Sequence, residues 1–241
     1  MIKKSLLISI FVIFYGCSSS SSMFKSDIER EKVLKLSSNY NQLINEYRQK
    51  LKDKNQDKDR LNLAKLYYET NDFNNALYYL EPMTQKGKSV DALILKALIL
   101  DKNQKTQKAL NALDLALKLD SKNAKAWNLK GVFLARSGNY SEAKICFLTA
   151  KEHFLDDLQV NANLGILELL NEDYISALSY FKPLYVRGYK DTKFLNSFVY
   201  SLIKNDELEL AKKVVRDEGI SDDFKVVLNA VSNSKINIHK D

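Results

Sequence analysis

Residues 124–155 read AKAWNLKGVFLARSGNYSEAKICFLTAKEHFL and carry the clearest copy of a pattern that recurs along the chain. Five alanines follow one another at spacings of 33 or 34 residues, with similar apolar positions around each: Ala76, Ala109, Ala143, Ala177 and Ala211. A period near 34 is that of stacked helical hairpins, which bury their apolar faces against one another. An ordinary helical bundle with accidental regularity is the alternative. It does not explain why an aromatic residue precedes three of the alanines by three positions.

Each recurring residue of the quoted stretch has a physical role in such a hairpin. Gly131 and Ala143 are small enough for two antiparallel helices to approach, and Gly138 supplies the turn between them. Large side chains fill the space within and between hairpins. The stretch closely resembles the tetratricopeptide consensus, whose signature positions are occupied here by Trp127, Gly131, Gly138, Tyr140, Ala143, Phe147 and Ala150.

Composition agrees with an all-helical chain. Among 241 residues, 45% are hydrophobic, but only 7 are glycine and 2 are proline, too few turn residues for a many-stranded β fold. The net charge of +7 is spread over faces of mixed sign, such as residues 52–59, and does not suggest nucleic-acid binding. The sequence therefore predicts an all-α solenoid of about five to six tetratricopeptide hairpins with a C-terminal capping helix.

Weaker copies of the pattern set the expected boundaries of the solenoid. Ser38, Asn39 and Tyr40 mimic the turn at Gly138, so residues 27–56 are expected to form a degenerate N-terminal repeat. The regular repeats are expected over residues 57–219. Residues 220–241 are expected to hold a capping helix over 221–231 and a polar tail, with Ser221 as the N-cap of that helix.

The N-terminus has the pattern of a secretory leader that ends before a cysteine. Residues 1–16 combine two lysines with an apolar run too short to span a bilayer comfortably, and Cys17 follows Gly16. This pattern resembles the bacterial lipobox, although Phe14 and Tyr15 depart from the family's preferred residues. The resemblance implies a signal peptide at 1–16, lipid on Cys17 and a serine-rich tether over 17–26. Alternatively, Cys17 is an ordinary cysteine of a cleaved leader or of an uncleaved anchor.

The expected lipid anchor gives an expected location. Acyl chains on Cys17 would hold the protein on a membrane essentially permanently. In the resembled lipoproteins, serine after the cysteine directs sorting to the outer membrane, which implies the periplasmic face of that membrane. The other cysteine, Cys146, then has no partner for an internal disulfide and is expected to be a small buried residue.

No motif in the sequence points to catalysis. The two histidines, His153 and His239, have no neighbours that would complete a metal site, and no phosphate-binding glycine loop or nucleophile motif occurs. We therefore expect a protein that is not an enzyme and that needs no cofactor, metal or small-molecule substrate.

A protein-binding groove is expected on the first helix of each hairpin, as in tetratricopeptide arrays. Alignment on Trp127 gives a mixed surface suited to a helix or an extended segment with apolar and some acidic groups. Some of these residues could instead be buried between helices. The predicted groove residues are Leu61, Lys65, Tyr68, Ile94, Leu98, Lys125, Asn128, Val132, Ala162, Ile166, Asn196 and Tyr200.

The C-terminal half resembles the TadD lipoproteins of the tight adherence (Flp) pilus system. The resembling residues are Asn161, Asn163, Leu164, Gly165, the turn at 174–177, Lys182, Pro183, Leu184, Gly188 and Tyr189. The resemblance implies an outer-membrane scaffold that assists assembly of the secretin or other pilus secretion components. The alternatives are a pilotin-like lipoprotein of type IV pili, or a periplasmic adaptor for peptidoglycan enzymes or outer-membrane protein assembly.

Overall fold

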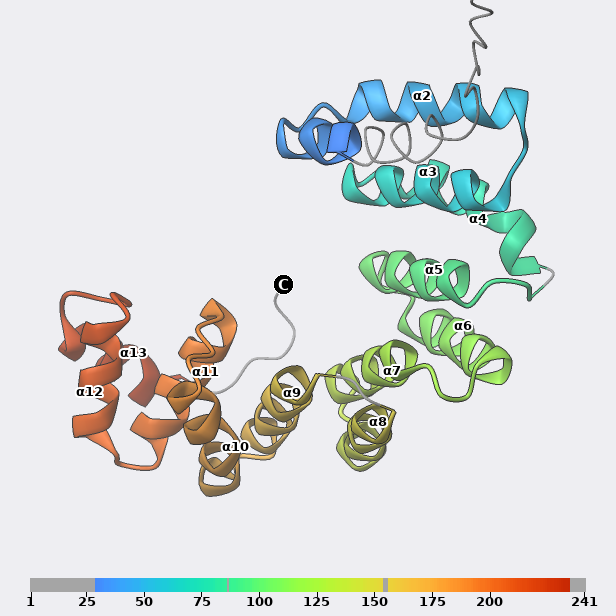
Figure 1. The fold of residues 1–241 in the computed structure, drawn as a ribbon. Coiled ribbons are helices and arrows are strands. Elements are labelled where there is room, and N and C mark those ends of the chain that lie inside the picture. The colour runs from blue at the N-terminus through green and yellow to red at the C-terminus, as the bar shows by residue number, and fades with distance from the viewer. Residues whose placement is uncertain (1–28, 86, 154–155, 235–241) are drawn as a thin grey trace, which may run out of the picture. The chain divides into compact units, whose positions relative to one another are not determined.

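The computed structural model describes residues 29–85, 87–153 and 156–234, and every regular element within them is a helix. The predicted leader, Cys17, the whole tether and most of the polar tail lie outside the described residues. Residues 29–36 are helical and precede α2 (Tyr40–Asp53), α3 (Asp57–Glu69), α4 (Phe73–Gln85), α5 (Val90–Lys102), α6 (Thr106–Leu119), α7 (Ala124–Arg136), α8 (Tyr140–Glu152), α9 (Asp157–Leu170), α10 (Tyr174–Val186), α11 (Thr192–Lys204), α12 (Leu208–Asp217) and α13 (Phe224–Ser232) (Figure 1).

The chain divides into two units, Met1–Asp72 and Phe73–Asp241. In the first unit, α2 packs on α3, and Leu43, Ile44 and Tyr47 are buried. The Tyr47 hydroxyl donates to Glu31 Oε2 at 2.8 Å, so the helical segment 29–36 is held against α2. Burial and this hydrogen bond raise the pKa of Tyr47.

In the second unit, helices α5 to α12 form successive hairpins, each packed on the next (Figure 1). In each hairpin the odd-numbered helix comes first and the even-numbered helix second. First helices of successive hairpins contact each other, α7 with α9 and α9 with α11. Within the described part of this unit, no two second helices form such a close pair. First helices therefore form an inner layer and second helices an outer layer. The expected all-α tetratricopeptide-like solenoid is confirmed.

A residue with positive φ follows the helical segment 29–36 and each of α3, α5, α7, α9 and α11, at spacings of 33 or 34 residues. At Gly138 the φ angle is 81°, and two hydrogen bonds close the helix end, from Gly138 N to Ala135 O (3.1 Å) and from Asn139 N to Leu134 O (2.9 Å). Only glycine adopts this conformation without a steric cost. The other five positions are nevertheless not glycine: Ser38, Asn71, Gln104, Glu172 and Asp206.

The repeated small residues lie where the helices approach most closely. All five alanines of the series are fully buried, with relative exposures of 0%. A Cβ atom placed on Gly131 would come within 2.7 Å of the Phe147 ring, and one on Gly165 within 2.3 Å of the Phe181 ring. The prediction that Gly131 permits close helix approach is therefore confirmed, and Gly165 repeats the arrangement one hairpin later.

The prediction that Ser221 caps the C-terminal helix is wrong. α13 begins at Phe224, and its N-cap is Asp223, whose side chain accepts from Lys225 N at 2.8 Å. The Ser221 hydroxyl instead accepts from Asp223 N at 3.2 Å. A carboxylate is the better acceptor for the free N–H groups at a helix start, because it also interacts favourably with the helix dipole.

Candidate protein-binding groove

One row of predicted groove residues runs along the first helices of the second unit. Leu98, Val132, Ile166 and Tyr200 are each 34 residues apart and lie on α5, α7, α9 and α11. All four are partly exposed while packing against the buried core. We call these four residues the apolar row. It offers apolar contact to a partner at the same position of four successive repeats.

A second set of predicted groove residues lies one helical turn earlier and is mostly buried. Ile94, Asn128 and Ala162 are 3%, 6% and 6% exposed, whereas Asn196 on α11 is exposed. For Asn128 and Ala162, the close packing of α7 on α9 accounts for this burial. These three side chains therefore lie beneath the surface of the inner layer.

The remaining predicted residues lie apart from these two sets. Lys125, at the start of α7, is exposed. Leu61, Lys65 and Tyr68 are on α3 in the first unit, where Lys65 is exposed and the other two are partly exposed. The part of the candidate groove that we describe as one surface is therefore the part on the second unit.

A partly buried amide pair links two first helices about one turn before the apolar row. Asn163 Nδ2 on α9 donates to Asn128 Oδ1 on α7 at 2.7 Å. Because a buried amide without a partner is costly, this bond favours one register between the two helices. Asn128 was predicted as a groove residue, and the structure gives its side-chain oxygen a partner within the protein.

A row of mostly basic residues, which sequence reasoning missed, lies one turn beyond the apolar row. Lys102, Arg136 and Lys204 occupy this position on α5, α7 and α11, and Leu170 occupies it on α9. Residues four positions apart are neighbours on a helix surface, so each basic side chain lies beside a member of the apolar row. Their 34-residue spacing was the signal that could have revealed them.

Two of these basic residues already have partners in the protein. Arg136 forms an ion pair with Asp101. Lys204 Nζ lies 5.5 Å from the centre of the Tyr200 ring and donates to Ser234 O at 3.2 Å. The chain that follows α13 therefore contacts the apolar row at its α11 end, where the Tyr200 hydroxyl donates to the same oxygen at 3.4 Å.

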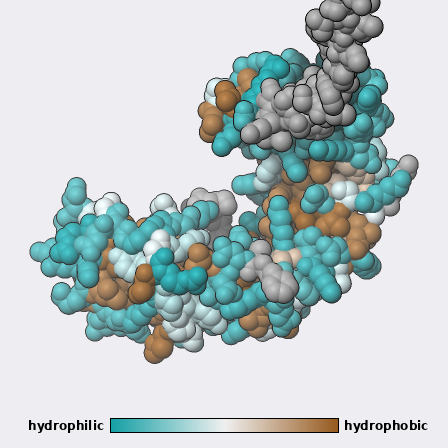
Figure 2. Space-filling view, in the orientation of Figure 1, coloured by the Kyte–Doolittle hydropathy of each residue, from teal (hydrophilic) through white to brown (hydrophobic). Residues whose placement is uncertain are grey.

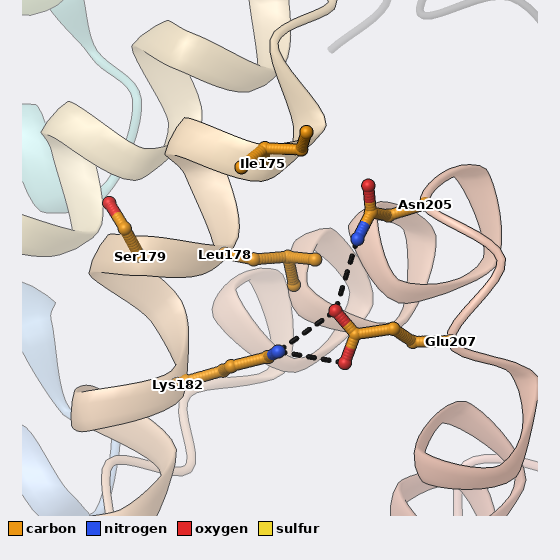
Figure 3. Close-up of a pocket in the computed structure, with 6 residues that line it drawn as sticks. All are labelled: Ile175, Leu178, Ser179, Lys182, Asn205 and Glu207. Carbon is orange, nitrogen blue, oxygen red and sulfur yellow. Dashed lines mark hydrogen bonds and ion pairs between the residues drawn. The ribbon is translucent and has the colours of Figure 1, made fainter.

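A small pocket lies on the outer layer, away from the predicted groove residues (Figure 3). Its volume is about 190 Å³, and it is lined by Ile175, Leu178, Ser179, Lys182, Asn205 and Glu207. Lys182 Nζ and Asn205 Nδ2 both donate to Glu207 Oε1, at 2.8 and 3.0 Å. These hydrogen bonds lower the pKa of Glu207 despite its partial burial. The charged groups of the pocket thus satisfy one another and join α10 to the start of α12.

Neither a candidate metal site nor an activated thiol occurs among the described residues. No group of three His, Cys, Asp or Glu side chains within them could hold a metal ion. Cys146 is buried, as predicted, and burial raises the pKa of its thiol to about 11, which disfavours the reactive thiolate. None of the described helices combines the length and the apolar composition required to cross a bilayer.

Comparison with known proteins agrees with this architecture. Residues 124–152 match the tetratricopeptide repeat family, and residues 37–116 match the family of anaphase-promoting complex, cyclosome, subunit 3. No curated protein was found to match the chain.

Solved structures of repeat proteins are similar in fold. A tetratricopeptide repeat protein from Parabacteroides merdae has a TM-score of 0.67 and 14% identity, covering 87% of this chain and 84% of that one. PilF from Pseudomonas aeruginosa has a TM-score of 0.64 and 21% identity, covering 73% and 80%. The C-terminal part of a repeat protein from Cytophaga hutchinsonii has a TM-score of 0.61 and 17% identity, covering 79% and 80%. At these identities the likeness is one of fold alone.

Proposed function

We propose that this chain, a member of the tetratricopeptide repeat family, is a lipid-anchored scaffold of the outer membrane that assists Flp pilus biogenesis. Its partner would be the secretin or another secretion component of the pilus system, held at the periplasmic face. A repeat scaffold of this kind is suited to protein–protein interaction. The observation that carries the proposal is the apolar row, because it repeats one contact on four helices and so suits a long protein segment.

The proposed anchor adds an effect that the groove alone would not have. A partner captured by a membrane-tethered array is concentrated at the membrane, which favours its assembly there. Covering the apolar surface of an unassembled subunit would also limit its aggregation. The role is therefore one of positioning, and it requires no chemical step.

The anchor is tested by metabolic labelling with palmitate. We expect label in the wild-type protein and none in the variant Cys17→Ser. Absence of label from the wild type would contradict the lipid anchor while leaving the groove untouched.

The groove is tested by a single charge placed in the apolar row. We expect Val132→Glu to reduce recovery of the partner in a pull-down by at least about tenfold, because a carboxylate would lose its hydration against an apolar ligand. Ile145→Glu is the matched control, since Ile145 is 62% exposed on the adjacent outer helix α8. Equal recovery with both folded variants would move the site elsewhere.

The pathway is tested in a deletion strain. We expect loss of the gene to deplete secretin multimers from the outer membrane. Normal multimers, together with co-purification of cell-wall hydrolases, would instead select the periplasmic adaptor.

A further inference from the structure

Most of the large apolar side chains that are exposed on the second unit lie on its outer layer. Within the described residues of that unit, all but one belong to second helices, and the exception, Val226, is on the capping helix α13. The members on second helices are Tyr78, Leu115, Leu119, Ile145, Leu148, Ile175 and Val186. The predicted groove lies on the other layer and does not account for them.

Helix α6 combines two of these leucines with lysines on one face. Leu115 and Leu119 are 49% and 48% exposed, and Lys108 lies on the same side of the helix, seven residues before Leu115. Lys118 borders the leucines, and Lys105 and Lys122 lie in the turns at the two ends of α6. We call these six residues the α6 face. Figure 2 shows hydrophobic residues gathered over α5 and α6, bordered by hydrophilic ones.

The lysines of the α6 face have no acidic partner among the described residues. Residues 87–136 contain ten Lys and Arg but only four Asp and no Glu. Asp101 pairs with Arg136, and Asp114 pairs with Lys130 at 2.7 Å. The carboxylate of Asp120 accepts from Lys122 N and Asn123 Nδ2, both at 3.1 Å, and so closes the turn after α6. The α6 face therefore carries uncompensated positive charge around exposed leucines.

We propose that the α6 face binds a membrane surface rich in anionic lipid headgroups. The lysines would lie at the lipid phosphates while Leu115 and Leu119 enter the interface, the combination by which basic amphipathic helices bind such surfaces. A flat surface can reach this face because α6 belongs to the outer layer. The choice of a lipid over an acidic protein rests on the proposed anchor at Cys17, which would hold the face near headgroups.

Vesicle binding of the full chain carrying Cys17→Ser tests the proposal without acylation. Partition is measured into vesicles of phosphatidylcholine alone and into equal parts of phosphatidylcholine and phosphatidylglycerol. The ratio of the two partition coefficients removes apolar binding that is common to both, including any from residues 1–16. We expect a ratio well above one that falls as salt is added, because headgroup attraction is screened.

A triple variant tests whether the α6 face carries this preference. We expect Lys108→Gln with Lys118→Gln and Lys122→Gln to lower the ratio by at least about tenfold, since one lysine near an anionic surface contributes roughly fivefold. The matched control replaces three exposed lysines on α12 and α13, Lys212, Lys213 and Lys225, and is expected to change the ratio by less than about threefold. Circular dichroism confirms that both variants are folded.

Two outcomes would overturn the proposal. One is an absence of preference for anionic vesicles in the parent protein, which would leave an acidic protein as the remaining kind of partner. The other is an equal loss in the two triple variants, which would show that net charge alone causes the binding. Neither bears on palmitate labelling of the wild type, so failure of this inference and failure of the proposed anchor are distinguishable.

Discussion

Single residues set how closely two helices of a hairpin can pack in this solenoid. Gly131 and Gly165 face Phe147 and Phe181, and the equivalent positions in the flanking repeats pair Ala97 with Leu113 and Val199 with Val215. In three of these four pairs a small residue on the first helix accompanies a larger one on the second, and in the fourth both residues are valine. The two side chains share one volume, so neither can be enlarged independently.

Gly165→Ala should therefore destabilise the protein. The new Cβ would meet the Phe181 ring, which is fully buried and contacts Phe194 and Phe198, so the ring cannot easily move. We expect a loss of about 1–2 kcal/mol in chemical denaturation, after the gain in helix propensity is subtracted. Adding Phe181→Leu should recover part of the loss. A Gly165→Ala protein as stable as wild type would contradict the close approach.

Glu172→Gly should stabilise the protein. Glu172 has a φ of 60°, in the left-handed region that costs a side chain about 1–2 kcal/mol, and the greater freedom of glycine in the unfolded chain offsets part of this gain. We expect a net increase of roughly 0.5–1 kcal/mol in the free energy of unfolding. Asn171→Gly is the control, because Asn171 has a φ of −80° and should gain nothing. A loss of stability in Glu172→Gly, or an equal change in the two variants, would refute the argument.

Helices are joined across repeats by a few polar contacts as well as by the core. Lys144 Nζ on α8 donates to Glu168 Oε1 on α9 at 2.7 Å, and the Glu168 side chain is only 11% exposed. This hydrogen bond raises the pKa of Lys144, despite partial desolvation. The contact compensates a carboxylate that the fold has largely removed from water.

Lys144→Met should cost about 1–2 kcal/mol, because Glu168 would lose its charged partner. This loss of stability is smaller than that expected for a wholly buried ion pair, because the Lys144 side chain is 47% exposed. Lys151→Met is the matched control on the same helix, since Lys151 pairs with exposed Asp157 at 3.6 Å. Thermal denaturation of both variants checks the difference. Similar midpoints would show that water already compensates Glu168.

The sequence predicted the positions of the helices better than it predicted which groove residues are exposed. The 34-residue spacing and the small residues identify the hairpins because they express contacts within one repeat. The burial of Asn128 and Ala162 depends on how closely α7 and α9 approach, which no single repeat encodes. The sequence also showed no sign of the left-handed conformation at Glu172 and Asp206. Glycine is the residue expected in this conformation, and within the series only position 138 carries it.

Over the whole second unit, stability should vary along the chain, because each hairpin contacts mainly its neighbours. α13 closes the C-terminal end, where Phe224, Val227, Leu228 and Val231 pack on the last core cluster. Truncation after Ile220 should therefore increase amide hydrogen exchange in α11 and α12 while leaving α5 and α6 protected. An equal loss of amide protection in all helices would indicate that the second unit unfolds as one cooperative unit.

Because contacts lie mainly between neighbouring hairpins, the second unit also has a characteristic response to force. If a bound partner pulled on one end of the second unit while the other end was held, the load would pass through every hairpin in series. The hairpins would then unfold one at a time rather than together, and each would lengthen the chain by about thirty-four unfolded residues. Such a chain would absorb sudden tension and re-form when the force falls.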